Sequence, residues 1–437
     1  MSTGKVWARK IRGVGAASLA QATQSATTFL VSMLAAHLLG IEALGLFSIL
    51  YGAFILAAGV TTGFVGDSLM VLNRHNDRIR SGLFAWFVVL ALSLGAVGLV
   101  CSFLGTELDF IGAVLYALAA ISYVAEDLVR RMHMAILSFS RIVLIDLSVM
   151  LVTGVVITGI LLAGKASIDS FILAVVCGQT AGLVFGWFLL PASERQGTKR
   201  PIGWKPVAAY GFWRAALQAL RPGQLTLTRI IVTAMIAMTA AGSLEIARIY
   251  AAPAALLVTG VCSYLFAHLA RDSHSSVGAK LRRTDQAVLR LVGATAVCLV
   301  IGLALLPWAG PLLTGSVPSA IAVSGWLAYS MAIAVSTPYG QLAAVEHRAR
   351  SVFVIRLSDS LLSILFVVGA IGMTHDYRWV PWAAALGSLA GGFSIRRFVV
   401  VALVRSDFRT SESDVQPEKA TMGVPVPSLS SKEHDPS

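Results

Sequence analysis

The sequence has 437 residues, of which 57% are hydrophobic and only 13% carry a charge. A soluble domain has about 25% charged residues. This composition, with a mean hydropathy of +0.78, therefore excludes a soluble globular protein and predicts a membrane protein with many spans. The net charge of +12 does not require a nucleic acid partner, because the positive charges are sorted to one side of the membrane.

Twelve mainly apolar segments follow one another along the chain, and a helix of about 20 such residues spans a bilayer. We therefore expect an all-α polytopic membrane protein with about twelve transmembrane helices. The turns are short, and the longest interior loop, at 191–206, falls near the middle of the chain. The expected helices cover residues 14–38, 44–72, 82–104, 109–131, 141–163, 168–190, 209–240, 243–269, 286–306, 319–343, 351–373 and 379–403.

The lysines and arginines set the orientation of these helices. With the N-terminus in the cytoplasm, the basic residues of the loops fall almost entirely on the inner side, and the outer loops hold only Lys165 and Arg378. This bias predicts that both termini are cytoplasmic. It also supports the number of spans, because one miscounted helix would scramble the pattern.

The two halves of the chain are alike. The segment LFSILYGAFIL (46–56) aligns with EIARIYAAPAA (245–255), which places Tyr51 over Tyr250. Six helices per half would give both copies the same orientation, as in a parallel repeat, although two apolar helices can also be alike by chance. We expect one six-helix bundle in 1–200, a second in 201–405 and a disordered cytoplasmic tail in 406–437, which is polar and rich in Ser and Pro.

Nothing in the sequence indicates a metal site or an enzyme. All four cysteines lie inside apolar segments without a CxxC or Cys/His cluster, so we interpret them as packing residues. No hydrolase, kinase or phosphate-loop signature appears, and the short loops leave no room for a soluble catalytic domain. We expect no cofactor and no catalytic residue.

The seventh apolar segment contains YGFWRAALQALRPGQLTLTRIIVTAMIA (210–237), with three arginines and a Pro-Gly break. An arginine near the centre of a spanning helix costs roughly 2.5–3.5 kcal/mol. Arg214 lies beside interface aromatics and can extend to the inner headgroups, whereas Arg221 lies deeper. Arg229 lies roughly 16 Å from the outer end at 1.5 Å per residue, near the midplane of a ~30 Å core. We expect Arg229 to face the bundle interior or a wet cavity, or to pair with an acid on another helix.

The first apolar segment carries a polar stripe. Its members step by three and four residues along one helical face: Ser18, Gln21, Ser25, Thr28 and Ser32. Such a stripe can hydrogen-bond to neighbouring helices or line a water-filled lumen, and both interpretations stay open.

Other charged residues in the apolar segments follow helical spacing. Arg248 follows Glu245 by three residues, so it either lines the cavity or forms a local salt bridge. The same reasoning pairs Arg356 with Asp359, Glu126 with Arg130, and Asp127 with Arg131.

Two further acids lie inside apolar runs. Asp67 and Asp146 are each within two turns of the inner surface. Either residue can serve as a proton or sodium site for ion coupling, or can pair with a cavity arginine.

Two segments carry a resemblance to a known family. LLGIEALGLFSILYGAF (38–54) and its second-half counterpart AAGSLEIARIYAAPAALL (240–257) resemble the polysaccharide-transport flippases, which move O-antigen and other lipid-linked oligosaccharides. These flippases belong to the multidrug/oligosaccharidyl-lipid/polysaccharide exporter superfamily. The resemblance extends to about residue 405. It implies two six-helix bundles around a central lumen, and a polyprenyl-diphosphate-linked oligosaccharide that is turned from the inner to the outer leaflet.

The resemblance implies that the arginines bind the diphosphate of the cargo, because guanidinium groups bind phosphate through charge-assisted, often bidentate hydrogen bonds. Arg221 and Arg229, with Arg248 and Arg214, would hold the diphosphate. The sugar would contact Gln21, Gln24, Ser25, Thr28 and Gln218. The family further implies the cell inner membrane, contacts with membrane lipids, and polysaccharide polymerase or export proteins as partners.

The sequence leaves three candidate functions. The first is the lipid-linked oligosaccharide flippase, and the second is an exporter of a small anionic metabolite or drug with the same fold. A membrane glycan polymerase or ligase is less favoured, because such enzymes need a sizeable outer loop.

Overall fold

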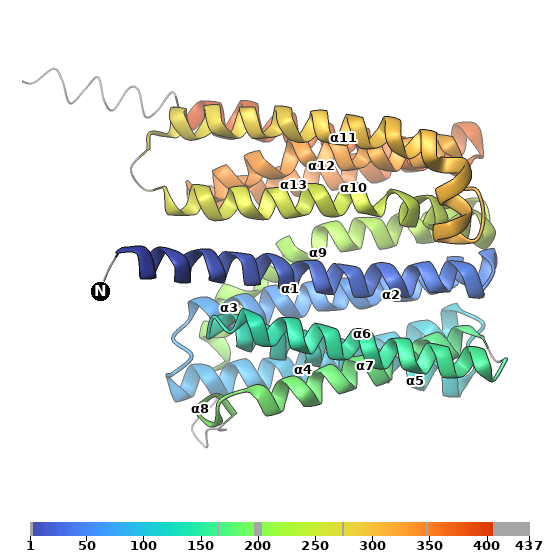
Figure 1. The fold of residues 1–437 in the computed structure, drawn as a ribbon, viewed down its shortest axis with the longest axis horizontal. Coiled ribbons are helices and arrows are strands. Elements are labelled where there is room, and N and C mark those ends of the chain that lie inside the picture. The colour runs from blue at the N-terminus through green and yellow to red at the C-terminus, as the bar shows by residue number, and fades with distance from the viewer. Residues whose placement is uncertain (1–2, 165, 196–202, 273–274, 347, 405–437) are drawn as a thin grey trace, which may run out of the picture.

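The computed structural model describes residues 3–164, 166–195, 203–272, 275–346 and 348–404, and every regular element in these ranges is helical (Figure 1). The disordered tail expected in 406–437 lies outside the described residues. The first half contains α1 (Thr3–Leu38), α2 (Ile41–Thr61), the π-helical turn η1 (Thr62–Gly66), α3 (Asp67–Val71), α4 (Asp77–Gly105), α5 (Phe110–Ala135), α6 (Phe139–Leu162), α7 (Ile168–Leu189) and the short α8 (Ala192–Arg195). The second half contains α9 (Trp204–Met235), α10 (Met238–Arg271), α11 (Val277–Thr314), α12 (Ala320–Val345), α13 (Ala349–Thr374), η2 (Tyr377–Trp379), α14 (Val380–Ser394) and η3 (Ile395–Val400).

These elements form twelve long helical segments that correspond one to one with the expected spans, since α2, η1 and α3 run on as one segment and η2, α14 and η3 as another. Several are longer than expected, because polar turns extend the apolar runs. The expected 286–306 is Val277–Thr314, which starts where the Ser276 hydroxyl accepts a hydrogen bond from the Ala279 amide (3.3 Å). The interior loop expected at 191–206 also contains the four-residue helix α8.

Ten helical segments of the described chain are long and apolar enough to cross a membrane. The two long helices outside this set are α1 and α9. These are the helices that carry the polar stripe and the three arginines, so the least apolar helix of each half is its first.

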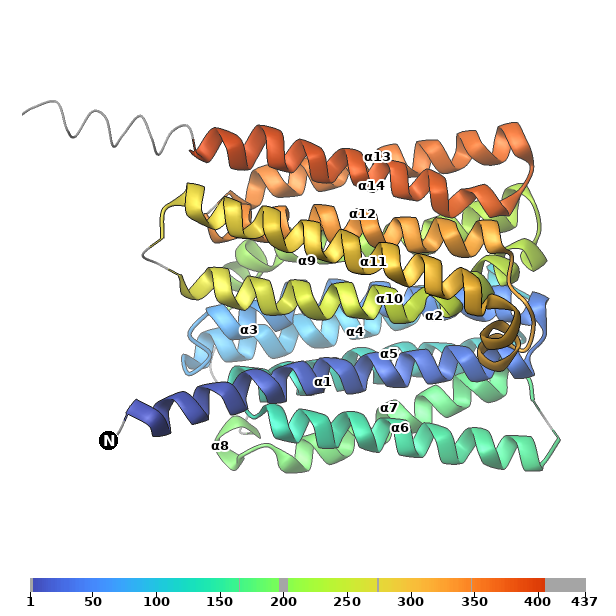
Figure 2. The same ribbon diagram turned by 45° about the horizontal axis from the view of Figure 1, so that its top comes forward.

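The long helices run side by side, with α4 to α7 towards one side and α11 to α14 towards the other (Figures 1 and 2). Between them, α1 and α2 pack against α10, and α2 also packs against α9. Tyr51 and Tyr250, aligned by the sequence repeat, are both buried, each in the hydrophobic core of its own half.

The helix α9 joins the two sides. At its start the Gly203 amide donates to the carbonyl of Arg78 in the first turn of α4 (3.0 Å), and its end leads directly into α10. Pro222 lies inside this helix, where a proline removes a backbone hydrogen bond and allows a bend. Because α9 packs against α2, η1 and α4 as well as α10 and α13, the domain boundary at 200/201 stays a prediction.

Glycines allow α2 and α10 to touch at the ends that the sequence places outside. A Cβ atom added at Gly242 would collide with the carbonyl oxygen of Ile41, and one added at Gly45 would collide with that of Met238. The backbones of the two helices are therefore in direct contact here, which closes this end of the interface between the halves.

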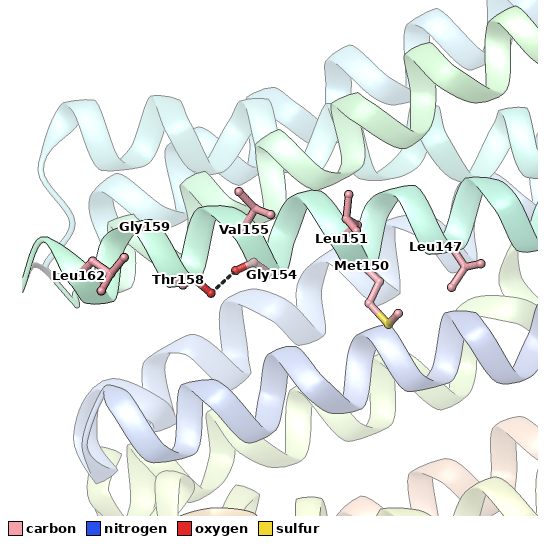
Figure 3. A pocket seen from close by; sticks show the side chains of 8 residues that line it. All are labelled: Leu147, Met150, Leu151, Gly154, Val155, Thr158, Gly159 and Leu162. Carbon is pink, nitrogen blue, oxygen red and sulfur yellow. Dashed lines mark hydrogen bonds between the residues drawn. The ribbon is translucent and has the colours of Figure 1, made fainter.

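This contact predicts opposite effects for two Gly→Ala substitutions. Replacing a helical glycine by alanine ordinarily stabilises by roughly 0.5–1 kcal/mol, and Gly154→Ala should do so. Gly154 lies on α6 in an open apolar groove of about 760 Å³, with no atom within 4 Å of an added Cβ (Figure 3). Gly242→Ala should instead destabilise by about 1–3 kcal/mol through overpacking. Thermal unfolding of the purified protein measures both, and an equal rise in the two midpoints would contradict the close contact.

Candidate functional site

A cavity of about 270 Å³ lies between α1, α2, α5 and α10. It is lined by Gln21, Gln24, Ser25, Thr28, Phe29, Ser32, Ile55, Tyr123, Arg248, Ile249, Ala252 and Leu256. Five predicted site residues are therefore brought together, four from α1 and one from α10. Among these lining residues Arg248 is the single charged side chain.

The stripe on α1 reaches this cavity because its spacing places the side chains on one face of the helix. Gln21, Ser25 and Thr28 line the cavity, whereas the side chain of Ser18 falls outside the described part of the chain. Another polar side chain of α1 faces a different helix: the Thr23 hydroxyl donates to the carboxylate of Asp146 on α6 (3.1 Å). The helix thus uses one polar side to line a cavity and another to bond to its neighbour.

Arg248 belongs to a buried triad with Glu245 and Arg229. Its Nη2 lies 2.5 Å from Glu245 Oε1, and its Nε lies 2.9 Å from Oε2. From α9, Arg229 donates to the same Oε2 through Nη2 (3.2 Å) and Nε (3.3 Å). The expected local pair of Arg248 with Glu245 is confirmed, and the same arginine also lines the cavity.

The triad carries two guanidinium groups and one carboxylate, and hence one surplus positive charge. Arg229 is 7% exposed and Glu245 4% exposed, whereas the Arg248 side chain is 28% exposed. The surplus positive charge is therefore accessible at Arg248, which is the most exposed of the three side chains. Arg229 takes the second of the two expected positions, an ion pair with an acid on another helix.

A glycine on α2 makes room for this triad. A Cβ atom added at Gly52 would lie 2.5 Å from Arg229 Nη1 and 2.9 Å from the Thr226 hydroxyl. The α2 backbone therefore approaches the buried guanidinium of Arg229 closely.

Glu245 as the partner of Arg229 was missed by the sequence reasoning. A signal existed, because the two residues lie at similar distances on either side of the tight turn between α9 and α10. Residues placed in this way on two antiparallel helices lie at the same depth in the membrane.

The other predicted site residues of α9 lie between Arg229 and the start of the helix. Arg214 pairs with Asp67 through Nη2 (2.6 Å) and Nε (2.8 Å), and its side chain is 39% exposed. Asp67 is buried and takes the position expected for a partner of an arginine. Gln218 is exposed, and Arg221 is half-buried and forms no ion pair or hydrogen bond with another described residue.

Asp146 lies in a second buried cluster, on the side of α5 and α6. Its Oδ1 is 2.7 Å from Arg130 Nε, a contact between helices that the sequence did not indicate. The expected pairs within α5 are confirmed: Arg130 with Glu126 (3.8 Å) and Arg131 with Asp127 (3.5 Å). Thr62, in the π-helical turn η1, donates a hydrogen bond to Asp127.

Comparison with solved structures identifies proteins that have a similar fold. No protein-family model matches the chain, and no curated protein sequence matches it. Among solved structures, an outward-facing multidrug resistance MATE family transporter of the MOP superfamily matches with a TM-score of 0.63 at 10% identity, over 92% of this chain and 96% of that chain. An inward-facing structure matches with a TM-score of 0.60 at 12% identity, over 90% and 96%. A MATE structure in the straight conformation matches with 0.64 at 12% identity, over 92% and 96%.

The chain has the fold of these transporters. This confirms the expected all-α polytopic fold with two helical bundles, whereas membership of the expected superfamily stays a prediction. The narrower polysaccharide-transport family stays a prediction.

The triad predicts a large stability loss for Glu245→Gln. Without the carboxylate, the buried guanidinium group of Arg229 and the partly exposed one of Arg248 lie close together unpaired, and breaking a buried pair typically costs about 3–5 kcal/mol. Glu42→Gln, at an exposed position in the first turn of α2, is the matched control and should stay within about 0.5 kcal/mol of the wild type. Chemical denaturation in mixed micelles measures both, and similar stabilities of the two variants would rule out a buried triad.

Proposed function

We propose that the chain is a membrane transporter that moves polyprenyl-diphosphate-linked oligosaccharide from the inner to the outer leaflet by alternating access, for the export of cell-surface polysaccharide. The observation that carries this proposal is the surplus positive charge at Arg248, presented to a cavity otherwise lined by uncharged groups. The fold supports transport, since solved structures with this fold are transporters in outward- and inward-facing conformations.

The cavity has the chemistry of a phosphate and sugar site. A diphosphate is anionic, and in a low-dielectric region it needs charge-assisted hydrogen bonds, which guanidinium supplies in bidentate form. The amides of Gln21 and Gln24 and the hydroxyls of Ser25 and Thr28 both donate and accept, as sugar hydroxyls require. The lipid tail can remain in the bilayer while the polar head occupies the cavity.

The two arginines of the triad then differ in role. Arg248 binds the phosphate, whereas Arg229, buried behind Gly52, is a positioning residue that holds Glu245. Because Arg229 already neutralises part of the Glu245 charge, Arg248 is freer to bind a second anion. Arg214, Arg221 and Gln218 lie nearer the start of α9, where the head group would pass before reaching Arg248.

The second candidate is an exporter of a small anionic metabolite or drug. The solved structures of this fold include multidrug resistance transporters, and the surplus charge suits any anion. A cationic drug is disfavoured, because none of the described residues that line the cavity is acidic.

A measurement of the pool of polyprenyl-linked oligosaccharide in cells with and without the gene distinguishes the two candidate functions. The flippase proposal expects completed carriers to accumulate on the inner face when the gene is missing. An unchanged pool and sidedness would contradict it and favour the small-anion exporter.

Complementation of the same cells tests Arg248. Arg248→Gln should lower flipping at least about tenfold, as expected for loss of one charge-assisted contact of roughly 1.5–3 kcal/mol. Arg248→Lys should retain part of the activity, because it keeps the charge but not the bidentate geometry. Arg378→Gln removes an equal charge from the ion pair with Asp376 (2.5 Å) in an expected outer loop, and it should leave the flipping activity unchanged. Full complementation by Arg248→Gln would exclude the residue from cargo binding.

For ion coupling, we favour Asp146 over Asp67. The cluster around Asp146 contains three carboxylates, with Glu126 and Asp127, against the guanidinium groups of Arg130 and Arg131. The cluster can therefore take up one proton, and the bond of Thr23 to Asp146 connects it to the cavity helix α1. Asp67 is matched one to one by Arg214.

This assignment predicts that Asp146→Asn removes the dependence of transport on a proton gradient. Asp67→Asn, also a buried aspartate, is the matched variant and should keep that dependence. Transport into proteoliposomes with and without an imposed pH difference measures both. A wild-type response in Asp146→Asn would exclude it as the coupling residue.

A further inference from the structure

The π-helical turn η1 contacts two charged parts of the protein that lie on different helices. Its five residues, 62–66, are all buried, and the turn packs against both α5 and α9. Side chains of α5 belong to the acidic cluster around Asp146, whereas the first half of α9 (204–221) carries Arg214. Turns of this type occur frequently at functional sites. We therefore compared the contacts that η1 makes with each of the two helices.

Towards α5, η1 makes one hydrogen bond and one close contact. The Thr62 hydroxyl donates to Oδ2 of Asp127. The same oxygen lies 3.5 Å from Nε of Arg131, and a Cβ atom added at Gly66 would lie 3.0 Å from Cγ of that arginine. A hydrogen bond to a carboxylate is roughly twice as strong as one between neutral groups. The strength with which α5 holds η1 therefore depends on the charge at Asp127.

The charge at Asp127 depends in turn on the rest of the acidic cluster. Arg130 lies 3.5 Å from Asp127 Oδ1 through Nη1 and 2.7 Å from Asp146 Oδ1 through Nε. A proton taken up at Asp146 thus changes the ion pairs of Asp127 through one shared guanidinium group. Beside this part of the cluster, α4 and α7 contribute the uncharged residues Phe87 and Gly182. The titratable side chains around Asp127 come from α2, α5 and α6: Tyr51, Tyr123, Glu126, Arg130, Arg131 and Asp146.

Towards α9, η1 makes backbone contacts that are followed by an ion pair. A Cβ atom added at Gly63 would lie 2.5 Å from the carbonyl oxygen of Arg214, and one added at Gly211 would lie 2.5 Å from that of Phe64. Directly after the turn, Asp67 Oδ2 lies 2.6 Å from Arg214 Nη2. The backbones of η1 and α9 therefore touch, and the position of the turn sets the position of the first half of α9.

We propose that Thr62 is a positioning residue that couples proton uptake by the acidic cluster to the position of the first half of α9. The inference rests on the proposed function, in which the cluster around Asp146 takes up the coupling proton. While the cluster is unprotonated, the bond from Thr62 to Asp127 holds η1 against α5, and η1 holds α9. Proton uptake lowers the negative charge at Asp127 and weakens this bond, which allows η1 and the first half of α9 to move away from α5.

The neighbouring threonine provides a matched control. Thr61 is 4% exposed and Thr62 is 6% exposed, so the two side chains are equally buried. The Thr61 hydroxyl, however, donates to the carbonyl of Ala57 within its own helix. A Thr→Val substitution preserves the shape of either side chain and removes its hydroxyl. Of the two substitutions, Thr62→Val is the one that removes a bond between helices.

The test measures the distance between α6 and α9 in the purified full-length protein at neutral and at acidic pH. Spin labels are attached at Ser140→Cys and Lys205→Cys, two exposed positions at the starts of these helices, after the four native cysteines are replaced by alanine. In the otherwise wild-type chain this distance should increase when the pH is lowered, because protonation weakens the bond that holds η1.

Thr62→Val should lose this response to pH and show the longer distance at both pH values. Thr61→Val should respond as the wild type does, and so should Thr62→Ser, which retains the hydroxyl. A wild-type distance that does not respond to pH, or the shorter distance in Thr62→Val at neutral pH, would overturn the inference. The same loss in Thr61→Val would also overturn it, because packing rather than the bond would then set the response.

The distance measurement requires no cargo, so its outcome is separate from that of the proposed function. If the purified protein did not move a polyprenyl-diphosphate-linked oligosaccharide in liposomes, the flippase proposal would fail. A response to pH that depends on the Thr62 hydroxyl would still support the coupling role of η1. Conversely, transport of this glycolipid by a protein whose α6–α9 distance ignores pH would contradict the coupling role alone.

Discussion

One carboxylate shared by two arginines inside the membrane is the interaction on which the account depends. Glu245 bonds to Arg229 from α9 and to Arg248 from its own helix. Burying these charges separately would be very costly, so the three groups must lie together. That requirement fixes α9 against α10 and draws α2 in at Gly52. It also leaves one positive charge over, and Arg248 carries that charge to the cavity wall.

The buried clusters of charged side chains differ in the sign of their net charge. Around Asp146 the carboxylates outnumber the guanidinium groups, whereas around Glu245 the guanidinium groups outnumber the carboxylates. In the proposed function the first kind takes up a proton and the second kind takes up an anionic head group. The cavity helix α1 lies between the two kinds, because Thr23 bonds to Asp146 while Gln24 and Thr28 face the cavity with Arg248. A movement of α1 would therefore affect both sites.

Hydropathy and the distribution of basic residues were sufficient to predict twelve helical segments, and helical spacing predicted the pairs within a helix, such as Arg248 with Glu245. Contacts between helices were harder to predict. The depth of Arg229 showed that it needed a partner or a wet surface, but it did not select Glu245 from the other acids. Arg130 was assigned only to its own helix, although Asp146 lies nearer to it. Such choices depend on the rotation and tilt of each helix, which a pattern along one helix does not contain. The stripe on α1 could be identified as one helical face, but the sequence left open whether it lines a lumen or bonds to neighbouring helices; in the structure Gln21, Ser25 and Thr28 line the cavity.

The central claim is that the cavity recognises the charge of the head group. Transport of one synthetic glycolipid by the purified protein in liposomes tests this most directly, when its diphosphate is compared with a neutral linker of equal length. The account predicts that the diphosphate form crosses to the opposite leaflet and that the neutral form stays at the rate of protein-free liposomes. Equal transport of the two forms would contradict it, because the surplus charge at Arg248 would then have no part in selecting the cargo.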